Sequence, residues 1–147
     1  KIAKSTQVQA LVTEKRIHQA IVDIFMEKGW DAISYGSIAK HTGLSRGGVQ
    51  RIVPNKVAMM GAFQGQVTEF VSEQLDFSNE NSLTESWISA LDNLQFRNCL
   101  KFFIGAIADD SAGKALAKKG FENFSEKVGQ EKMQTLIGLS VYRLLDA

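Results

Sequence analysis

The sequence predicts an all-α protein, with three helices at the N-terminus followed by a larger helical bundle. Apolar residues recur at helical spacing along most of the 147 residues, and no segment shows the alternation of a strand. Pro54 is the only proline, so long helices can run uninterrupted. The apolar fraction of 44% is enough for a core, and the single cysteine, Cys99, excludes an internal disulfide and suits a reducing compartment.

The first helix is expected over residues 7–28. Its apolar residues fall at i, i+3, i+4, i+7 and i+8, which makes one stripe along the helix surface. Gly29 follows as a C-terminal stop. The residues of the stripe are Ile17, Ala20, Ile21, Ile24 and Phe25.

Two serines predict the starts of the next two helices. Ser34 is a typical N-cap for a short helix that reaches His41, and Ser45 is a typical N-cap for a helix over residues 46–52. Gly43 lies between them and breaks the first of the two.

Pro54 and Asn55 mark the start of a long helix over residues 56–75, so we place a domain boundary between residues 55 and 56. The expected domains are 1–55 and 56–147. A polar, turn-like segment follows over residues 76–82, and four further helices are expected after it. These helices cover residues 83–94, 97–108, 112–128 and 131–145.

The charge is unevenly distributed along the chain. Up to Val57 there are nine Lys and Arg against four Asp and Glu, a net charge of +5, and the remainder has eight against twelve, a net charge of −4. No acidic residue occurs from Ala32 to Thr68. A basic, acid-free segment is typical of a surface that binds a polyanion, although a solvated face without acids would give the same pattern.

The spacing around Gly43 predicts a helix-turn-helix. Ala39 is small where the two helices cross, and Gly43 supplies the positive φ of the turn. The apolar residues that hold the pair together are Ile38, Leu44, Val49 and Ile52. The residues left on the outward face of the second helix, the face that enters a major groove, are Arg46, Gly47, Gln50 and Arg51. An ordinary helical hairpin is the alternative interpretation.

The stretch from Lys15 to Phe63 resembles the DNA-binding domain of the tetracycline-repressor (TetR, AcrR-like) family of bacterial transcription regulators. The matching features are "FMEKGW", "IAKHTGLSRGGV" and "PNK" leading into a long helix. The segment "RNCLKFFIGAIADD" is similar to one that the family often carries in its second domain. The resemblance implies a cytoplasmic, homodimeric repressor of transcription. It would bind a palindromic site on double-stranded DNA and be released when its C-terminal domain binds a small-molecule effector.

The residues expected to contact DNA come from the outward face of the helix over residues 46–52 and from the starts of the helices. By resemblance Lys56 clamps a phosphate at the start of its helix, and Tyr35 has the same role at the start of the helix that reaches His41. The full set is Ser34, Tyr35, Ser45, Arg46, Gly47, Gly48, Gln50, Arg51 and Lys56.

The chain also departs from the family pattern. The family commonly has threonine at the position of Gly48, tyrosine at that of Gln50 and phenylalanine at that of Val53. Gln50 could bond an adenine edge or a phosphate, and Arg51 could bond a guanine or a phosphate. Gly48 either brings the helix close to the groove or is a tolerated substitution. Gly36 offers no side chain where some relatives read a base.

The second half holds the expected effector and dimer residues. No strong charged group is available there to orient a ligand, which favours a hydrophobic one. The expected lining is Phe63, Val67, Trp87, Leu91, Phe102 and Phe103. The last helix is apolar around more than one stripe, which indicates a subunit interface formed with the helix before it. The expected interface residues are Leu116, Phe124, Leu136, Val141 and Leu144.

The sequence argues against several other functions. It has no nucleophile elbow, phosphate-binding loop or HExxH, so an enzyme is not expected. The two histidines lack partners at metal-ligand spacing, and we expect no metal, no cofactor and no membrane segment. The alternative function is a helical interaction or small-molecule-binding module that has lost specific DNA binding.

Overall fold

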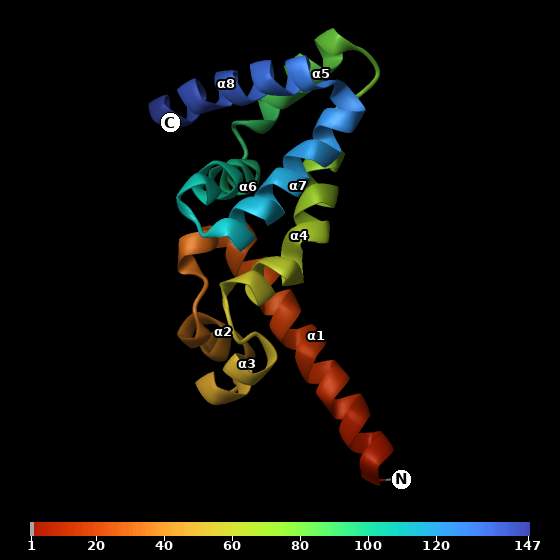
Figure 1. Ribbon diagram of the computed structural model, residues 1–147, viewed down its shortest axis with the longest axis vertical. Helices are drawn as coiled ribbons and strands as arrows, with labels where there is room; N and C mark the ends of the chain where they lie inside the picture. The colour runs from red at the N-terminus through yellow and green to blue at the C-terminus, as the bar shows by residue number, and fades with distance from the viewer. Residues whose placement is uncertain (1) are drawn as a thin grey trace. The chain divides into compact units, whose positions relative to one another are not determined.

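The computed structural model describes residues 2–147, with side chains from Thr6 onward, and it confirms the all-α prediction (Figure 1). Those residues form eight α-helices and two short 3-10 turns, with no strand among them. In chain order the elements are α1 Ile2–Lys28, η1 Trp30–Ala32, α2 Tyr35–Thr42, α3 Arg46–Ile52, α4 Lys56–Glu73, α5 Glu80–Ala90, α6 Leu94–Gly105, η2 Ala106–Ala108, α7 Ser111–Val128 and α8 Gln130–Asp146.

Three helices start three or more residues earlier than expected: α1 begins at Ile2 rather than at residue 7, and asparagines cap the earlier starts of the other two. The Asn79 side chain accepts a hydrogen bond from the Ser82 backbone N–H at 2.8 Å, so α5 begins at Glu80 rather than at residue 83. Asn93 accepts from the Phe96 N–H at 3.0 Å, so α6 begins at Leu94 rather than at residue 97. The predicted helix over residues 83–94 was therefore wrong at both ends.

The chain divides into two compact units, one up to Phe63 and one from Gln64 onward. In the first unit the Phe25 and Phe63 rings stack with centroids 4.5 Å apart, and Trp30 lies against Phe63 at 5.7 Å. Ile38 and Val49 are fully buried in the same unit. This core fixes α2 and α3 beside α1, whose N-terminal half extends beyond them (Figure 1).

The second unit is built around Trp87 of α5. Its indole N–H donates to the Ser140 hydroxyl of α8 at 2.6 Å, and its ring meets Phe96 edge-on at 5.3 Å. Helices α6 and α7 approach each other closely at Gly120, where an added Cβ would lie 2.6 Å from the Phe103 ring. The second unit therefore has a packed interior of its own.

Candidate nucleic-acid interface

The candidate interface begins with the start of α2 and the turn that follows it. The Ser34 hydroxyl accepts from the Ser37 N–H at 3.0 Å and the Ser37 hydroxyl accepts from the Ser34 N–H at 2.9 Å, a reciprocal capping box. At the other end Gly43 has φ 77° and donates to the Ala39 carbonyl at 2.8 Å. A glycine is needed there because side chains rarely tolerate this φ.

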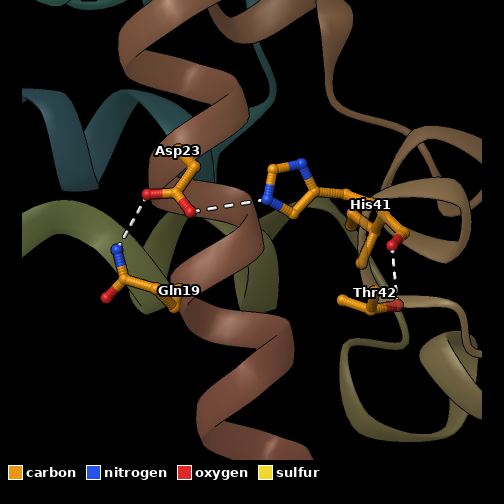
Figure 2. Close-up of polar contacts among 5 residues, drawn as sticks. Gln19, Asp23, His41 and Thr42 are labelled. Atoms are coloured by element: carbon orange, nitrogen blue, oxygen red, sulfur yellow. Dashed lines mark hydrogen bonds and ion pairs between the residues drawn. The ribbon is translucent and has the colours of Figure 1, made fainter.

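Polar contacts tie the end of α2 to α1, as Figure 2 shows. His41 Nε2 lies 3.4 Å from Asp23 Oδ2, an ion pair when the imidazole is protonated. Gln19 Nε2 donates to Asp23 Oδ1 at 2.9 Å, and Arg16 donates to the Thr42 carbonyl at 2.5 Å. Thr42 is the last residue of α2, so these contacts join α1 to the C-terminal end of α2.

Helix α3 separates its buried and exposed residues as the sequence predicts. Val49 is fully buried and Ile52 is half-buried, which anchors one side of the helix. The opposite side carries exposed residues, namely Arg46, Gly47, Gln50 and Arg51. The structure therefore brings the proposed base-reading residues together on one surface of the helix.

The two glycines of α3 have different surroundings. A Cβ at Gly47 would meet nothing within 4 Å, whereas a Cβ at Gly48 would lie 3.1 Å from the Ser45 hydroxyl. That hydroxyl caps α3 by accepting from the Gly48 N–H at 3.0 Å. Gly48 thus leaves room for the cap, while Gly47 leaves open space on the outward side.

The Arg46 side chain contacts α2 at Gly36. A Cβ at Gly36 would lie 3.1 Å from Arg46 Nη2, 3.4 Å from Cζ and 3.5 Å from Nε. The guanidinium edge therefore rests on the bare backbone of Gly36. The sequence analysis gave Gly36 and Arg46 separate roles and did not predict their contact, because no local pattern links residues ten positions apart across a turn.

The remaining predicted DNA-binding residues lie at helix starts. Lys56 is exposed at the first position of α4, where the Asn55 side chain accepts from the Ala58 N–H at 2.9 Å. Tyr35 is half-buried at the first position of α2. No acidic residue occurs between Ala32 and Thr68, so α2, α3 and the start of α4 carry positive charge with no carboxylate of their own segment to offset it.

The predicted effector residues are mostly core residues. Phe63 stacks on Phe25 in the first unit, and Trp87 bonds Ser140 inside the second. Val67, Leu91 and Phe102 are also buried, at 1%, 4% and 7% exposure. Phe103 alone of the six lines an apolar groove of about 800 Å³ on the second unit.

Four elements form the walls of the groove, namely α6, η2, α7 and α8. Its apolar lining is Phe103, Ala106, Ile107, Ala117, Phe121, Met133 and Ile137. Lys114, Lys118 and Glu122 of α7 stand along it, and Lys118 pairs with Glu122 at 3.8 Å. Gly138 also lines the groove, and a Cβ there would meet nothing within 4 Å.

The predicted dimer residues fall into two groups. Phe124 and Leu136 are 4% and 1% exposed, so they belong to the interior of the second unit. Leu116 and Leu144 are half-buried, and Val141 is 37% exposed. Near Val141 the C-terminal end of α8 also exposes Tyr142 and Leu145, at 75% and 78%.

Among residues 2–147, no helix has the length and hydropathy to cross a bilayer. In the same part of the chain, no three His, Cys, Asp or Glu side chains gather as metal ligands would. Burial raises the pKa of the Cys99 thiol to about 12, which keeps it protonated.

A family model described as the tetracycline repressor LuxT C-terminal domain matches residues 64–144. The match covers more than half of the chain and nearly all of the second compact unit, which begins at Gln64. It confirms the family that the sequence resembles. No match was found among curated proteins.

Proposed function

Because the chain belongs to the tetracycline-repressor family and is therefore a transcriptional regulator rather than an enzyme, we propose that it is a homodimer that binds a palindromic DNA operator and is released by a small apolar effector. The single observation that carries DNA binding is the outward face of α3. It presents Arg46, Gln50 and Arg51 to solvent from a helix that Val49 anchors in the core.

Lys56 tests the phosphate part of this proposal. Lys56→Ala should weaken binding about equally on all sequences and lower the slope of log affinity against log salt by about one unit, because one counterion-releasing contact is lost. The measurement is fluorescence anisotropy with a random duplex at rising salt. Lys119→Ala, an exposed lysine in the second unit, is the matched control and should leave the slope unchanged.

An unchanged slope in the Lys56→Ala variant would contradict the phosphate contact. If the wild-type protein itself shows no salt-dependent binding to duplex DNA, the alternative function, a helical module without specific DNA binding, replaces the proposal. Selection from a randomised duplex library supplies the preferred site for the later experiments.

Arg51 tests sequence reading. Arg51→Ala should cost roughly 1–3 kcal/mol on the selected duplex and relax the preference at one position, if its guanidinium makes a bidentate guanine contact. The same anisotropy measurement on selected and random duplexes separates the two roles. Equal losses on both duplexes mean that Arg51 contacts a phosphate only.

We further propose that the groove of α6, α7 and α8 binds the effector. Its volume of about 800 Å³ lies in the range of small-molecule sites, and its lining is mainly apolar. This moves the proposed ligand site away from the buried residues Trp87, Leu91 and Phe102, whose side chains already fill the core.

The groove is tested with 1-anilinonaphthalene-8-sulfonate as a fluorescent apolar probe. Gly138→Phe should abolish most of the fluorescence gain, because the new ring extends into the open space of the groove. Gly65→Phe is the matched control, since Gly65 is also exposed on a helix with nothing within 4 Å but does not line the groove. Equal probe binding by Gly138→Phe and the wild type would remove the groove from the proposal.

A further inference from the structure

We propose that Gly36 of α2 is a positioning residue for Arg46 of α3, and that this contact sets which DNA sequence the regulator prefers. The inference rests on the proposed DNA binding. It assigns Gly36 a role beyond the absence of a side chain. The bare backbone of Gly36 is the surface against which the Arg46 guanidinium of the neighbouring helix packs.

The contact is close along a whole edge of the guanidinium. The position that a Cβ would take at Gly36 lies 3.1 Å from Nη2, 3.4 Å from Cζ and 3.5 Å from Nε of Arg46. At 3.1 Å a methyl group is closer than an ordinary van der Waals contact, so alanine at this position displaces the guanidinium by a few tenths of an ångström or turns it to another rotamer.

The backbone on each side of the contact is fixed by a helix cap. Gly36 lies inside the capping box formed by Ser34 and Ser37, with bonds of 2.9 and 3.0 Å. Arg46 follows Ser45, whose hydroxyl accepts from the Gly48 N–H at 3.0 Å. Because α2 and α3 also pack directly on each other, the Arg46 side chain gives way more readily than either backbone.

Nothing else in the described chain holds the Arg46 guanidinium. From Thr6 to Ala147 no carboxylate forms an ion pair with it and no side-chain or backbone oxygen accepts from it. The residue is exposed, and its own segment from Ala32 to Thr68 contains no acid. Packing on Gly36 therefore decides where its five N–H donors stand before DNA arrives.

The placement of those donors bears on recognition because an arginine reads a guanine through two parallel bonds of fixed geometry. A guanidinium already seated near its bound position loses less side-chain freedom on binding. Displacing the guanidinium changes which base edge its two parallel N–H donors can reach. A positive charge that acted only by attraction to phosphates would bind all sequences alike.

The experiment is a double-mutant cycle with Gly36→Ala, Arg46→Ala and the combined variant. Each protein is first put through selection from a randomised duplex library, and its affinity for the wild-type selected duplex is then measured by anisotropy. Gly36→Ala should alter base preference at the same base pairs as Arg46→Ala. It should lower affinity on the order of fivefold when Arg46 is present and less than twofold when Arg46 is alanine, since contacting residues do not act additively.

A readout without DNA distinguishes this inference from the function on which it rests. The Arg46 Nε–Hε resonance, identified by its absence in Arg46→Ala, should shift in Gly36→Ala because the guanidinium has left its seat. Gly61→Ala is the matched control: Gly61 is on α4 of the same unit, exposed, and has nothing within 4 Å. That variant should change neither the resonance nor the base preference.

Arg46→Lys is a second variant that keeps the charge and the Gly36 backbone but removes the planar group, and it should also change the base preference. It covers the case in which Gly36→Ala does not fold. An equal affinity loss from Gly36→Ala in both Arg46 backgrounds, or an unchanged preference in Arg46→Lys, would overturn the inference while leaving DNA binding intact. A wild-type protein that binds no duplex would overturn the proposed function itself.

Discussion

At the scale of single residues, the second unit depends on one buried polar contact. Ser140 is fully buried on α8; its hydroxyl accepts from the Trp87 indole N–H at 2.6 Å and donates to the Leu136 carbonyl at 2.6 Å. Because both residues are buried, the Ser140 hydroxyl supplies the acceptor that the indole N–H needs, and this hydrogen bond joins α5 to α8.

Ser140→Ala should destabilise the protein by about 1–3 kcal/mol, because the Trp87 N–H stays buried without an acceptor. Urea unfolding followed by tryptophan fluorescence measures the change. Thr135→Ala is the control on the same helix, since the Thr135 hydroxyl makes only an exposed bond to the Glu131 carbonyl at 3.1 Å. Equal stability losses for the two variants would show that the indole finds another partner.

Cys99 should be unreactive in the folded protein. Burial raises the pKa of its thiol from 9.0 to about 12, and the thiolate is the reactive form. A disulfide reagent at mildly alkaline pH should label the native protein far more slowly than the protein in concentrated guanidinium chloride. Rapid native labelling would show that the second unit opens readily around α6.

The same shift gives stability a pH dependence. Since the folded pKa is raised, the thiol makes no difference to stability below pH 9.0, and between 9.0 and about 12 the unfolded chain loses a proton that the folded chain keeps. The free energy of unfolding should therefore fall as the pH rises through that window. Cys99→Ala, compared with the wild type in urea, should show a weaker fall.

At the scale of elements, glycines separate helix contacts from helix surfaces. Gly120 lies where α7 meets α6, and an added Cβ would be 2.6 Å from Phe103 Cε1 and 3.1 Å from Cζ. Gly138 of α8 and Gly65 of α4 have no atom within 4 Å of that position. A glycine in a regular helix can therefore either permit close packing or lie on an open surface. Only the position of the neighbouring helix distinguishes the two cases.

Gly120→Ala should destabilise by roughly 1–3 kcal/mol, because overpacking against the Phe103 ring outweighs the better helix propensity of alanine. Gly65→Ala should stabilise by up to about 1 kcal/mol, since nothing opposes the propensity gain. Thermal unfolding of both variants gives the comparison. A stabilised Gly120→Ala variant would mean that the Phe103 ring moves aside without strain.

At the scale of the whole molecule, we expect a second copy of the chain to cover the exposed apolar end of α8. Tyr142 and Leu145 are 75% and 78% exposed and Val141 is 37% exposed, and all three lie near the C-terminal end of the helix. Exposed apolar clusters of this kind mark interaction surfaces. By contrast Leu136, at 1% exposure, faces the interior.

We expect the protein to be a dimer at micromolar concentration and the Tyr142→Glu, Leu145→Glu double variant to be a monomer. The monomer should bind a palindromic duplex far more weakly, because only a dimer places two recognition helices about 34–36 Å apart on DNA. Light scattering with size-exclusion chromatography measures the assembly, and Thr135→Glu, exposed elsewhere on α8, is the control. A monomeric wild type, or a variant that still dimerises, would place the interface elsewhere.

The sequence by itself determined what depends on residues a few positions apart. Serine caps before α2 and α3, the positive φ of Gly43 and the outward arginines of α3 could all be predicted, since capping, turns and helical faces are local properties. The asparagine caps of α5 and α6 are equally local features. They were missed because the starts of those two helices were predicted from hydrophobic periodicity alone.

The tertiary structure decided what depends on how helices meet. The hydrogen bond from Trp87 to Ser140 joins residues 53 positions apart, and the packing of Arg46 against Gly36 joins two helices across a turn. The groove likewise depends on the spacing of α6, α7 and α8, so residues such as Leu91 and Phe102, apolar enough for a ligand site, pack in the core instead. Periodicity shows which face of a helix is apolar, but only the packing of the helices determines what that face contacts.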